Sequence, residues 1–155
     1  MIAVIQRVIN ADVQIEGKVK GQIQKGLLIL LGITHLDSEE DIAWISKKIV
    51  GMRIFSDDED KQNAARMNLD ISAIDGDILL ISQFTLHAST KKGNRPSFIE
   101  AARPEVAIPL YEKTIQRLEQ DLGKKIQTGE FGADMKVSLI NDGPVTIILD
   151  SKNKI

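Results

Sequence analysis

The sequence predicts a single α+β domain spanning residues 1–155, with a mostly antiparallel sheet or a partly closed barrel and two main helices. Three observations support this prediction. The length of 155 residues is ordinary for one domain and is enough to bury a full core. Strand-like segments at both ends of the chain are joined by short turns, which favour antiparallel pairing. Two segments between them change to the apolar spacing of amphipathic helices.

The first third of the chain predicts four strands. Residues 1–9 alternate loosely and are rich in Val and Ile, and residues 11–16 continue in the same way. After a short turn, the sequence VKGQIQ at 19–24 predicts a third strand. The run LLILLGI at 27–33 is apolar on both faces and is therefore typical of a buried strand.

The apolar spacing changes after this run and predicts a first helix. Apolar residues recur three and four positions apart, at Ile42, Ile45, Ile49 and Met52. Ser38, followed three residues later by Asp41, resembles a capping box in which Asp replaces the usual Glu. Trp44 lies next to the apolar stripe, and we expect it in the core or in an interface.

The middle of the chain predicts a loop, a strand and another loop. Segment 56–70 is polar, and its acidic run DDED lacks the spacing of a calcium loop, which favours a solvated loop over a cation site. Residues 75–86 combine turn residues with a continuous apolar run and predict a strand. Residues 87–98 predict the second loop.

A second helix is expected over residues 103–123. Its apolar stripe comprises Ile108, Tyr111, Ile115, Leu118 and Leu122. Pro104 and Pro109 lie in or near the first turns, where a missing backbone donor costs least, and Gly123 suits the C-terminal stop. The rest of the chain predicts two strands separated by a turn at NDGP, residues 141–144.

Composition narrows the classes of function. The chain has no cysteine, which excludes disulfides and thiolate metal sites, and His35 and His87 lack ligand spacing. No signal peptide or membrane-length apolar stretch is present, so we expect a cytoplasmic protein. The net charge of −2 argues against a broad grip on a long duplex. It is compatible with a nucleic acid held at one end, and Lys91, Lys92 and Arg95 form a local basic cluster.

Three short stretches differ from routine core or loop. The first, SQFTL at 82–86, brings Ser82, Gln83 and Thr85 to the end of a buried strand, from which polar groups are often presented to a ligand. Such residues also satisfy local backbone groups, which is the alternative interpretation. A Ser-His-Asp triad is poorly supported, because no G-x-S-x-G elbow is present.

The other two stretches are NRPSF at 94–98 and GPVT at 143–146. Pro96 holds Arg95 extended, so that Arg95 could meet a phosphate or carboxylate through two hydrogen bonds, although an exposed turn is the alternative. An X-Pro bond is the only kind for which the cis form is cheap. A cis bond at 143–144 would turn two carbonyl oxygens toward one ammonium group, with a plain β-turn as the alternative.

Together, SQFTL, NRPSF and NDGPVT resemble the D-aminoacyl-tRNA deacylases. The stretches MIAVIQRV, GLLILLGI and GEFGADM fit the same pattern, and the resemblance covers essentially the whole chain. It implies a homodimer that hydrolyses the ester between tRNA and a D-amino acid, or glycine mischarged on alanine tRNA. It implies no metal and no organic cofactor. The implied partners are the acceptor end of aminoacyl-tRNA and a second copy of the chain, with no DNA and no membrane.

The resemblance also implies roles for individual residues at the ester and along the tRNA. It places Ser82, Gln83, Phe84 and Thr85 at the ester, with the N–H groups of Gln83 and Phe84 facing the developing oxyanion. Phe131 and Met135 would hold the terminal adenine. Asn94 and Arg95 would bind substrate, and the basic cluster would contact the tRNA backbone.

The resemblance gives the turn near the C-terminus a role in selecting D-amino acids. A cis bond between Gly143 and Pro144 would enter the partner subunit's active site and hold the α-amino group of the substrate. It would leave no room for an L side chain, which is specificity by built-in clash. Arg7 would steady this segment.

Several alternatives stay open. Hydrolysis would use either Thr85 as the nucleophile or a water activated by the 2′-hydroxyl of the tRNA, and the lack of a credible base beside Thr85 favours the water. The chain could instead be an esterase that uses Thr85 or Ser82 on another substrate, or a non-catalytic dimeric module that binds a small amine. A related fold that edits L-alanyl-tRNA has altered motifs, and SQFTL and NRPSF point away from it.

Overall fold

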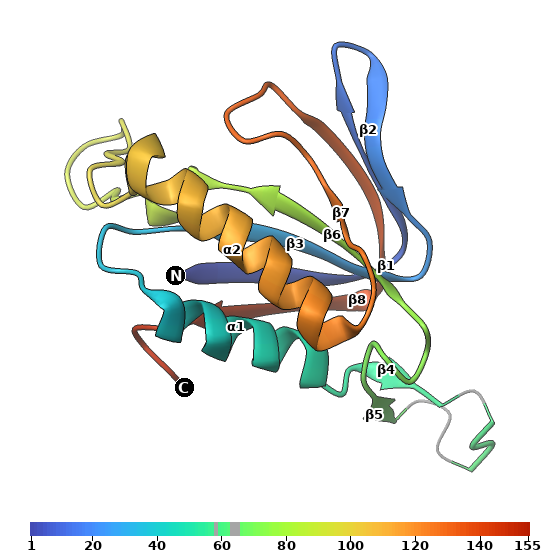
Figure 1. Cartoon of the computed structure of the whole chain (residues 1–155). Helices are drawn as coiled ribbons and strands as arrows, with labels where there is room; N and C mark the ends of the chain where they lie inside the picture. Colours follow the sequence, from blue (N-terminus) through green and yellow to red (C-terminus); the bar gives the residue numbers. More distant parts are fainter. Residues whose placement is uncertain (58, 63–65) are drawn as a thin grey trace.

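The computed structural model describes residues 1–57, 59–62 and 66–155, and the long strand β1 (Ile2–Ile15) organises its sheet (Figure 1). One edge of β1 pairs antiparallel first with β3 (Gly26–Gly32) and then with β2 (Lys18–Ile23). Its other edge pairs antiparallel with β8 (Lys136–Asp150). The two strands expected at 1–9 and 11–16 are therefore one strand, and a shift of register replaces the expected break.

Two parallel pairings extend the sheet beyond β3. β6 (Asp77–Ser82) pairs with β3, and the short β7 (Gln127–Thr128) pairs with β6. The far strand β2 also lies against β6 and β7, so the sheet curls toward a closed barrel. The expectation of a mostly antiparallel, partly closed barrel with two helices is confirmed, with these two parallel pairings added.

Both helices cover one face of the sheet and pack against each other (Figure 1). α1 is Glu39–Gly51, and α2 is Pro104–Leu122. The main core lies between the helices and the sheet and contains Ala3 and Ile5 of β1. A second apolar cluster contains Val8, Ala11 and Val13 from the other half of β1, together with residues of β2, β3 and β6. A single strand therefore contributes to two cores.

The end signals predicted for the helices are confirmed. At the start of α1, the backbone N–H of Ser38 donates to Asp41 Oδ2 at 2.8 Å, as a capping box requires. The stripe residues Ile42, Ile45 and Ile49 are buried, and the partly buried Trp44 packs against the core. α2 ends at Gly123, whose φ of 79° is left-handed.

The buried face of α2 is shifted from the predicted stripe. Tyr111 and Leu118 are buried as predicted, but Ile108 is 37% exposed. Ala107 and Thr114 are buried instead. The face is centred one residue earlier than predicted, because the small Ala107 and the polar Thr114 do not stand out in an apolar pattern.

The predicted loop at 56–70 has short strands at its ends. β4 (Phe55–Ser56) and β5 (Met67–Leu69) pair antiparallel as a separate small sheet. The acidic run at 57–60 includes residue 58, which lies outside the described residues, so its interpretation as a solvated loop stays a prediction. No helix in the described parts of the chain is long and apolar enough to cross a membrane.

The end of the chain contains one long strand where a strand–turn–strand unit was predicted. β8 pairs with β1 on both sides of NDGP, with Gln6 opposite Thr146 and Val8 opposite Asn141. Residues 142–145 therefore bulge out opposite Arg7. The chain does not reverse here because β1 pairs with β8 on both sides of these residues, and Asn141 Oδ1 accepts the backbone N–H of Val145 at 2.8 Å across the bulge. The predicted turn is a strand bulge.

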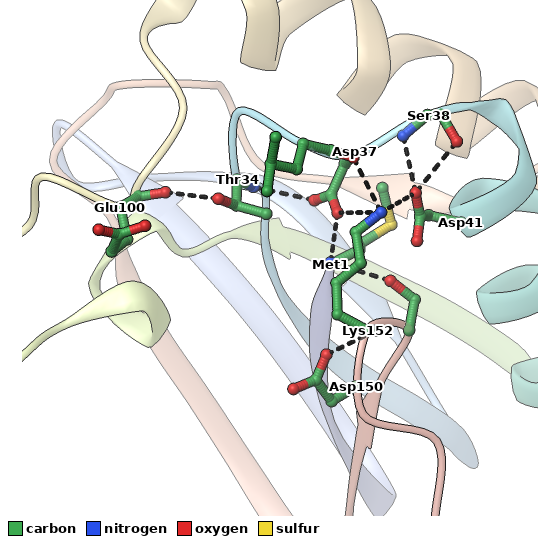
Figure 2. A network of polar contacts seen from close by, with 10 residues as sticks. Met1, Thr34, Asp37, Ser38, Asp41, Glu100, Asp150 and Lys152 are labelled. Carbon is green, nitrogen blue, oxygen red and sulfur yellow. Dashed lines mark hydrogen bonds and ion pairs between the residues drawn. The ribbon is translucent and has the colours of Figure 1, made fainter.

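A polar network joins the amino end of the chain to the start of α1 and to the segment after β8 (Figure 2). The amino group of Met1 donates to Asp37 Oδ1 at 2.5 Å and to Ser151 Oγ at 3.0 Å, and the ion pair with Asp37 is fully buried. Lys152 Nζ lies 2.7 Å from Asp41 Oδ2. We call Met1, Asp37, Asp41, Ser151 and Lys152 the N-terminal corner.

The carboxyl group of Asp41 in this corner is held ionised. Burial alone would raise the pKa of Asp41, but hydrogen bonds from Lys152, Ser151 and Ser38 outweigh it and hold this pKa well below its usual range. The backbone N–H of Thr34 donates to the carboxylate of Asp37, and the Thr34 hydroxyl donates to the Glu100 carbonyl at 2.7 Å. The corner thus braces the loop after β3 against the segment that leads to α2 (Figure 2).

Candidate functional site

The site begins where β6 ends. The backbone N–H of Gln83 donates to the Leu31 carbonyl at 2.8 Å, which is the last contact between β6 and β3. The chain then turns into the single-turn helix η1, Phe84–His87. The strand predicted over 75–86 is therefore shorter than expected, and SQFTL spans a strand end and a 3₁₀ turn. Ser82 and Gln83 are half-buried, while Phe84 and Thr85 are exposed.

A cavity of about 250 Å³ opens at this strand end. Its walls come from the ends of β3 and β6, from the start of α2 and from the segment before β8. It brings together five of the residues that sequence analysis singled out, although some are about fifty positions apart. The residues that line it are Leu31, Ile33, Ile81, Ser82, Gln83, Phe84, Ala102, Ala107, Phe131, Gly132, Ala133, Met135 and Val137.

The backbone donors near the cavity differ from the expected pair. We expected the N–H groups of Gln83 and Phe84 to face an oxyanion, but the Gln83 N–H is engaged with the Leu31 carbonyl. Among the described residues, the N–H of Phe84 has no hydrogen-bond acceptor. Phe84 lies at the first position of η1, where a backbone N–H has no partner within the helix. Only the Phe84 member of the expected pair is free to act as a donor.

Thr85 faces an amide rather than a base. Gln83 Nε2 donates to Thr85 Oγ1 at 2.5 Å, and an amide group cannot take a proton from a hydroxyl at neutral pH. The nearest imidazole in sequence belongs to His87. Its Nε2 is buried and has no hydrogen-bond partner among the described residues, Thr85 included. The described residues therefore provide no general base in contact with Thr85.

An aromatic contact connects SQFTL with NRPSF. The rings of Phe84 and Phe98 meet edge to face, with centroids 5.2 Å apart. Ser89 and Ser97 exchange backbone hydrogen bonds and close the loop between them. Asn94 and Arg95, at the far end of this loop, are exposed and do not line the cavity. The basic residues Lys91 and Lys92 are exposed in the same loop.

The bulge of β8 lies apart from the cavity of its own chain. Gly143 and Pro144 are exposed, the peptide bond between them is cis as the resemblance implies, and neither residue lines the cavity. Arg7 holds the base of the bulge, because its Nε donates to the Asp142 carbonyl at 3.0 Å and its Nη1 donates to the Ile54 carbonyl at 2.6 Å.

Glycine is required at position 143. Its φ is +129°, and a Cβ added there would lie 2.9 Å from Val145 Cγ2 and 3.0 Å from Arg7 Nη2. Any side chain at this position would therefore displace the bulge or the arginine that holds it.

The sequence pattern predicted Tyr111 only as part of the apolar stripe of α2, and the structure adds a polar contact next to the site. Its hydroxyl donates to the Leu80 carbonyl at 3.0 Å, and its ring lies 5.9 Å from that of Phe131. A buried tyrosine hydroxyl usually has a hydrogen-bond partner, which was the signal available in the sequence. No group of three or more metal-ligating side chains occurs within the described residues.

Comparisons with known proteins agree over the full length of the chain. A family model described as D-Tyr-tRNA(Tyr) deacylase matches residues 4–150. The chain is 63% identical to a D-aminoacyl-tRNA deacylase of Cytophaga hutchinsonii and 58% identical to one of Flavobacterium johnsoniae, over 99% of both chains in each case.

Solved structures show the same fold. One, titled c-Myc DNA Unwinding Element Binding Protein, superposes with a TM-score of 0.87 at 35% identity and covers 97% of this chain and 98% of its own. Another, titled as a probable eukaryotic D-amino acid tRNA deacylase, gives a TM-score of 0.81 with 96% and 97% coverage. At 14% identity, the second likeness concerns the fold alone.

Proposed function

Because the chain belongs to the D-Tyr-tRNA(Tyr) deacylase family, we infer that it is a hydrolase that cleaves the ester of D-aminoacyl-tRNA. The reaction releases free tRNA and a D-amino acid. Glycine mischarged on alanine tRNA is a second substrate in this proposal. The protein acts in the cytoplasm, on the acceptor end of its substrate.

One observation carries the proposal. The cavity at the end of β6 gathers Ser82, Gln83 and Phe84 with Phe131 and Met135. In the proposed complex, the terminal adenine lies against Phe131 and Met135, because an aromatic face suits a base. The ester then lies at the strand end, near the unpartnered N–H of Phe84. That N–H is the oxyanion donor of the proposal, and such donors can lower a barrier by roughly 3 kcal/mol.

We assign the attack on the ester to a water molecule that the 2′-hydroxyl of the tRNA activates. The contacts of Thr85 support this assignment, because its side-chain partner is the Gln83 amide and no base contacts it among the described residues. In this scheme, Thr85 and Gln83 shape the cavity wall, and the tRNA supplies the group that moves the proton.

Selection against L substrates is assigned to the bulge of a second copy. Gly143 and Pro144 are exposed and lie outside the cavity of their own chain, which is what a group that serves a neighbouring chain requires. Arg7 and Asn141 fix the bulge, so that it presents its backbone carbonyl groups in one orientation. The proposed enzyme is therefore a homodimer in which each chain completes the other's site.

The proposed tRNA contacts are few and local. Lys91, Lys92 and Arg95 lie exposed on the loop between Phe84 and Phe98, and they are assigned to the phosphate backbone near the acceptor end. Asn94 is assigned to the same contact. A net charge of −2 suits recognition of one end of a nucleic acid rather than of a long duplex.

Hydrolysis of matched D- and L-substrates tests the function. Purified protein should release D-tyrosine from D-tyrosyl-tRNA and leave L-tyrosyl-tRNA intact. Equal hydrolysis of both, or of neither, would refute the proposal and favour an esterase of other specificity or a binding module for small amines.

The Thr85→Ala variant tests the assignment of the attacking group. It should retain near-normal turnover, and a loss of a thousandfold or more would restore threonine as the nucleophile.

Mixing two inactive variants tests the shared site. Gln83→Ala alters the cavity and Gly143→Ala displaces the bulge, so each homodimer should be impaired. After subunit exchange at equal concentrations, about a quarter of the sites combine an intact cavity with an intact bulge from the other chain, which follows from random pairing in a two-fold dimer. Recovery of about that fraction of activity is expected. No recovery despite mass-spectrometric evidence of mixed dimers would show that the bulge serves its own chain or none.

A further inference from the structure

Tyr111 lies beneath the cavity and does not line it. Its side chain is only 4% exposed, and it is one helical turn after Ala107, which forms part of the cavity wall. Burial raises the pKa of the phenol, so the hydroxyl stays protonated and acts as a donor. A buried tyrosine therefore supports the site from the side of α2.

The Tyr111 hydroxyl donates to a backbone carbonyl that accepts two hydrogen bonds. The Leu80 carbonyl accepts both Tyr111 Oη at 3.0 Å and the backbone N–H of Gly129 at 3.3 Å. Leu80 precedes Ser82 by two residues, and Gly129 precedes Phe131 by two. A single carbonyl oxygen thus joins α2 to the strand end and to the segment that carries the aromatic wall of the cavity.

The ring of Tyr111 supports the same wall directly. Its centroid lies 5.9 Å from that of Phe131, at an interplanar angle of 56°. The next part of the wall packs against Gly129, since a Cβ added there would overlap the sulfur of Met135 and lie 3.3 Å from Ile81 Cδ1. Tyr111 therefore contacts Phe131 directly, and it shares the Leu80 carbonyl with Gly129, against which Met135 packs.

We propose that Tyr111 is a positioning residue that fixes the Phe131–Met135 wall relative to the strand end at Ser82, and so sets how tightly the terminal adenosine is bound. This inference rests on the proposed function, in which that wall holds adenine. The adenine does not change during ester hydrolysis, so its contacts are equal in the ground state and the transition state. Loosening the wall should therefore weaken binding and leave the chemical step unchanged.

Two substitutions at Tyr111 separate the hydroxyl from the ring. Tyr111→Phe removes the bond to the Leu80 carbonyl and keeps the ring, whereas Tyr111→Leu removes both. Single-turnover hydrolysis of D-tyrosyl-tRNA at increasing enzyme concentrations gives a half-saturating concentration and a limiting rate. We expect the half-saturating concentration to rise about threefold for Phe and about tenfold for Leu, with limiting rates within about twofold.

Thr114→Val is the matched control. Thr114 is fully buried on the same helix, but its hydroxyl donates to the Leu110 carbonyl at 2.7 Å within α2 and does not reach the cavity. The control therefore also loses a buried hydroxyl from α2, without loosening the wall. Its half-saturating concentration should equal that of the unmodified protein, at a temperature where circular dichroism shows every variant folded.

The outcomes separate this proposal from the function on which it rests. If the unmodified protein fails to hydrolyse D-tyrosyl-tRNA, the proposed function fails, and the assignment of adenosine binding to Tyr111 fails with it. If the unmodified protein is active, an unchanged half-saturating concentration in Tyr111→Leu overturns the role of Tyr111 alone. An equal rise in Thr114→Val, or a fall in limiting rate that exceeds the rise in half-saturating concentration, does the same.

Discussion

The N-terminal corner and the strand-end site both lie at the end of β3, and they treat their polar groups in opposite ways. In the corner, the amino group of Met1 and the carboxylate of Asp37 are fully buried and paired, and Asp41 accepts from Lys152. At the strand end, within the described residues, the Phe84 N–H and His87 Nε2 have no partner. Thr85 is bonded to a neutral amide two residues away.

The paired groups of the corner stabilise the fold, whereas the unpaired groups at the strand end are available to a ligand. Buried polar groups are nearly always satisfied, so a paired group contributes stability, and a group left without a partner is available for binding or chemistry. Substitutions in the corner should therefore change the stability of the protein, and substitutions at the strand end should change its activity. Three substitutions and an acid titration test this division.

Asp37→Ala should lower the free energy of unfolding by roughly 3–5 kcal/mol, because it leaves the buried amino group of Met1 without its counter-charge. Urea unfolding measures this loss. Hydrolysis of D-tyrosyl-tRNA per folded molecule should stay within about twofold of the unmodified protein. Asp37→Asn is the milder variant if Ala prevents folding. A stability change below 1 kcal/mol in both variants would contradict the assignment of the corner to stability.

Arg7→Lys should affect both properties, because Arg7 joins the bulge of β8 to the segment before β4. A single ammonium group cannot reproduce the two separate hydrogen bonds to the Asp142 and Ile54 carbonyls. We expect the free energy of unfolding to fall by about 2 kcal/mol, and kcat/KM on D-tyrosyl-tRNA to fall about tenfold. A loss of stability with full activity would show that the bulge tolerates displacement.

Phe84→Ala should change activity alone. The Phe84 side chain is 56% exposed and contacts Phe98 by an edge, so its removal should alter the free energy of unfolding by less than about 0.5 kcal/mol. Because the ring forms part of the cavity wall, kcat/KM should fall about tenfold, which corresponds to about 1.4 kcal/mol. Ile99→Ala, at a 76% exposed residue outside the cavity wall, is the control and should change neither quantity.

Acid titration should give the smallest effect. The pKa of Asp41 is lower in the folded chain than in the unfolded chain, so its contribution is complete above about pH 5 and is lost as the pH falls through the folded value. Asp41→Asn should therefore show a shallower loss of stability between about pH 5 and pH 2, measured by urea unfolding at each pH. Glu39→Gln is the control. Lys113 lowers the pKa of Glu39 as well, but this carboxyl is exposed, so its effect should be weaker.

Local patterns predicted the helices well because their signals are short-range. The capping box at Ser38 and Asp41, the stripe of α1 and the stop at Gly123 all depend on residues within a few positions of one another. The strands were harder to predict, because their ends depend on distant partners. β6 stops where Gln83 meets Leu31, more than fifty residues earlier, and no local pattern indicates that contact.

The largest error concerned NDGP, and its cause is also non-local. Asn, Asp, Gly and Pro in sequence are typical of a turn, and a turn would reverse the chain. Here β1 pairs with β8 on both sides of these residues, so the direction of the strand is preserved. Within the bulge, the side chain of Asn141 accepts the backbone N–H of Val145 and links the two ends of the projecting segment.

Part of the predicted site comes together in one cavity, while the roles of its residues stay predictions and their contacts could not be foreseen. The short matched stretches identified Ser82, Gln83, Phe84, Phe131 and Met135, and the structure places all of them around one cavity. It could not be seen from sequence that the Gln83 N–H is used within the sheet, or that the Tyr111 hydroxyl meets the Leu80 carbonyl. The buried pair of Met1 and Asp37 was also missed, since a chain end is not a motif.

The bulge of β8 has a consequence for how this fold can vary. Residues 142–145 are mounted between two paired stretches of the same strand, so the sheet fixes both of their ends. We expect insertions or deletions within them to change the length of an outward projection and to keep the pairing of the flanking stretches with β1. The sheet therefore anchors both ends of a replaceable projection. Peptides of other lengths, grafted there, would present a chosen backbone shape to a facing molecule.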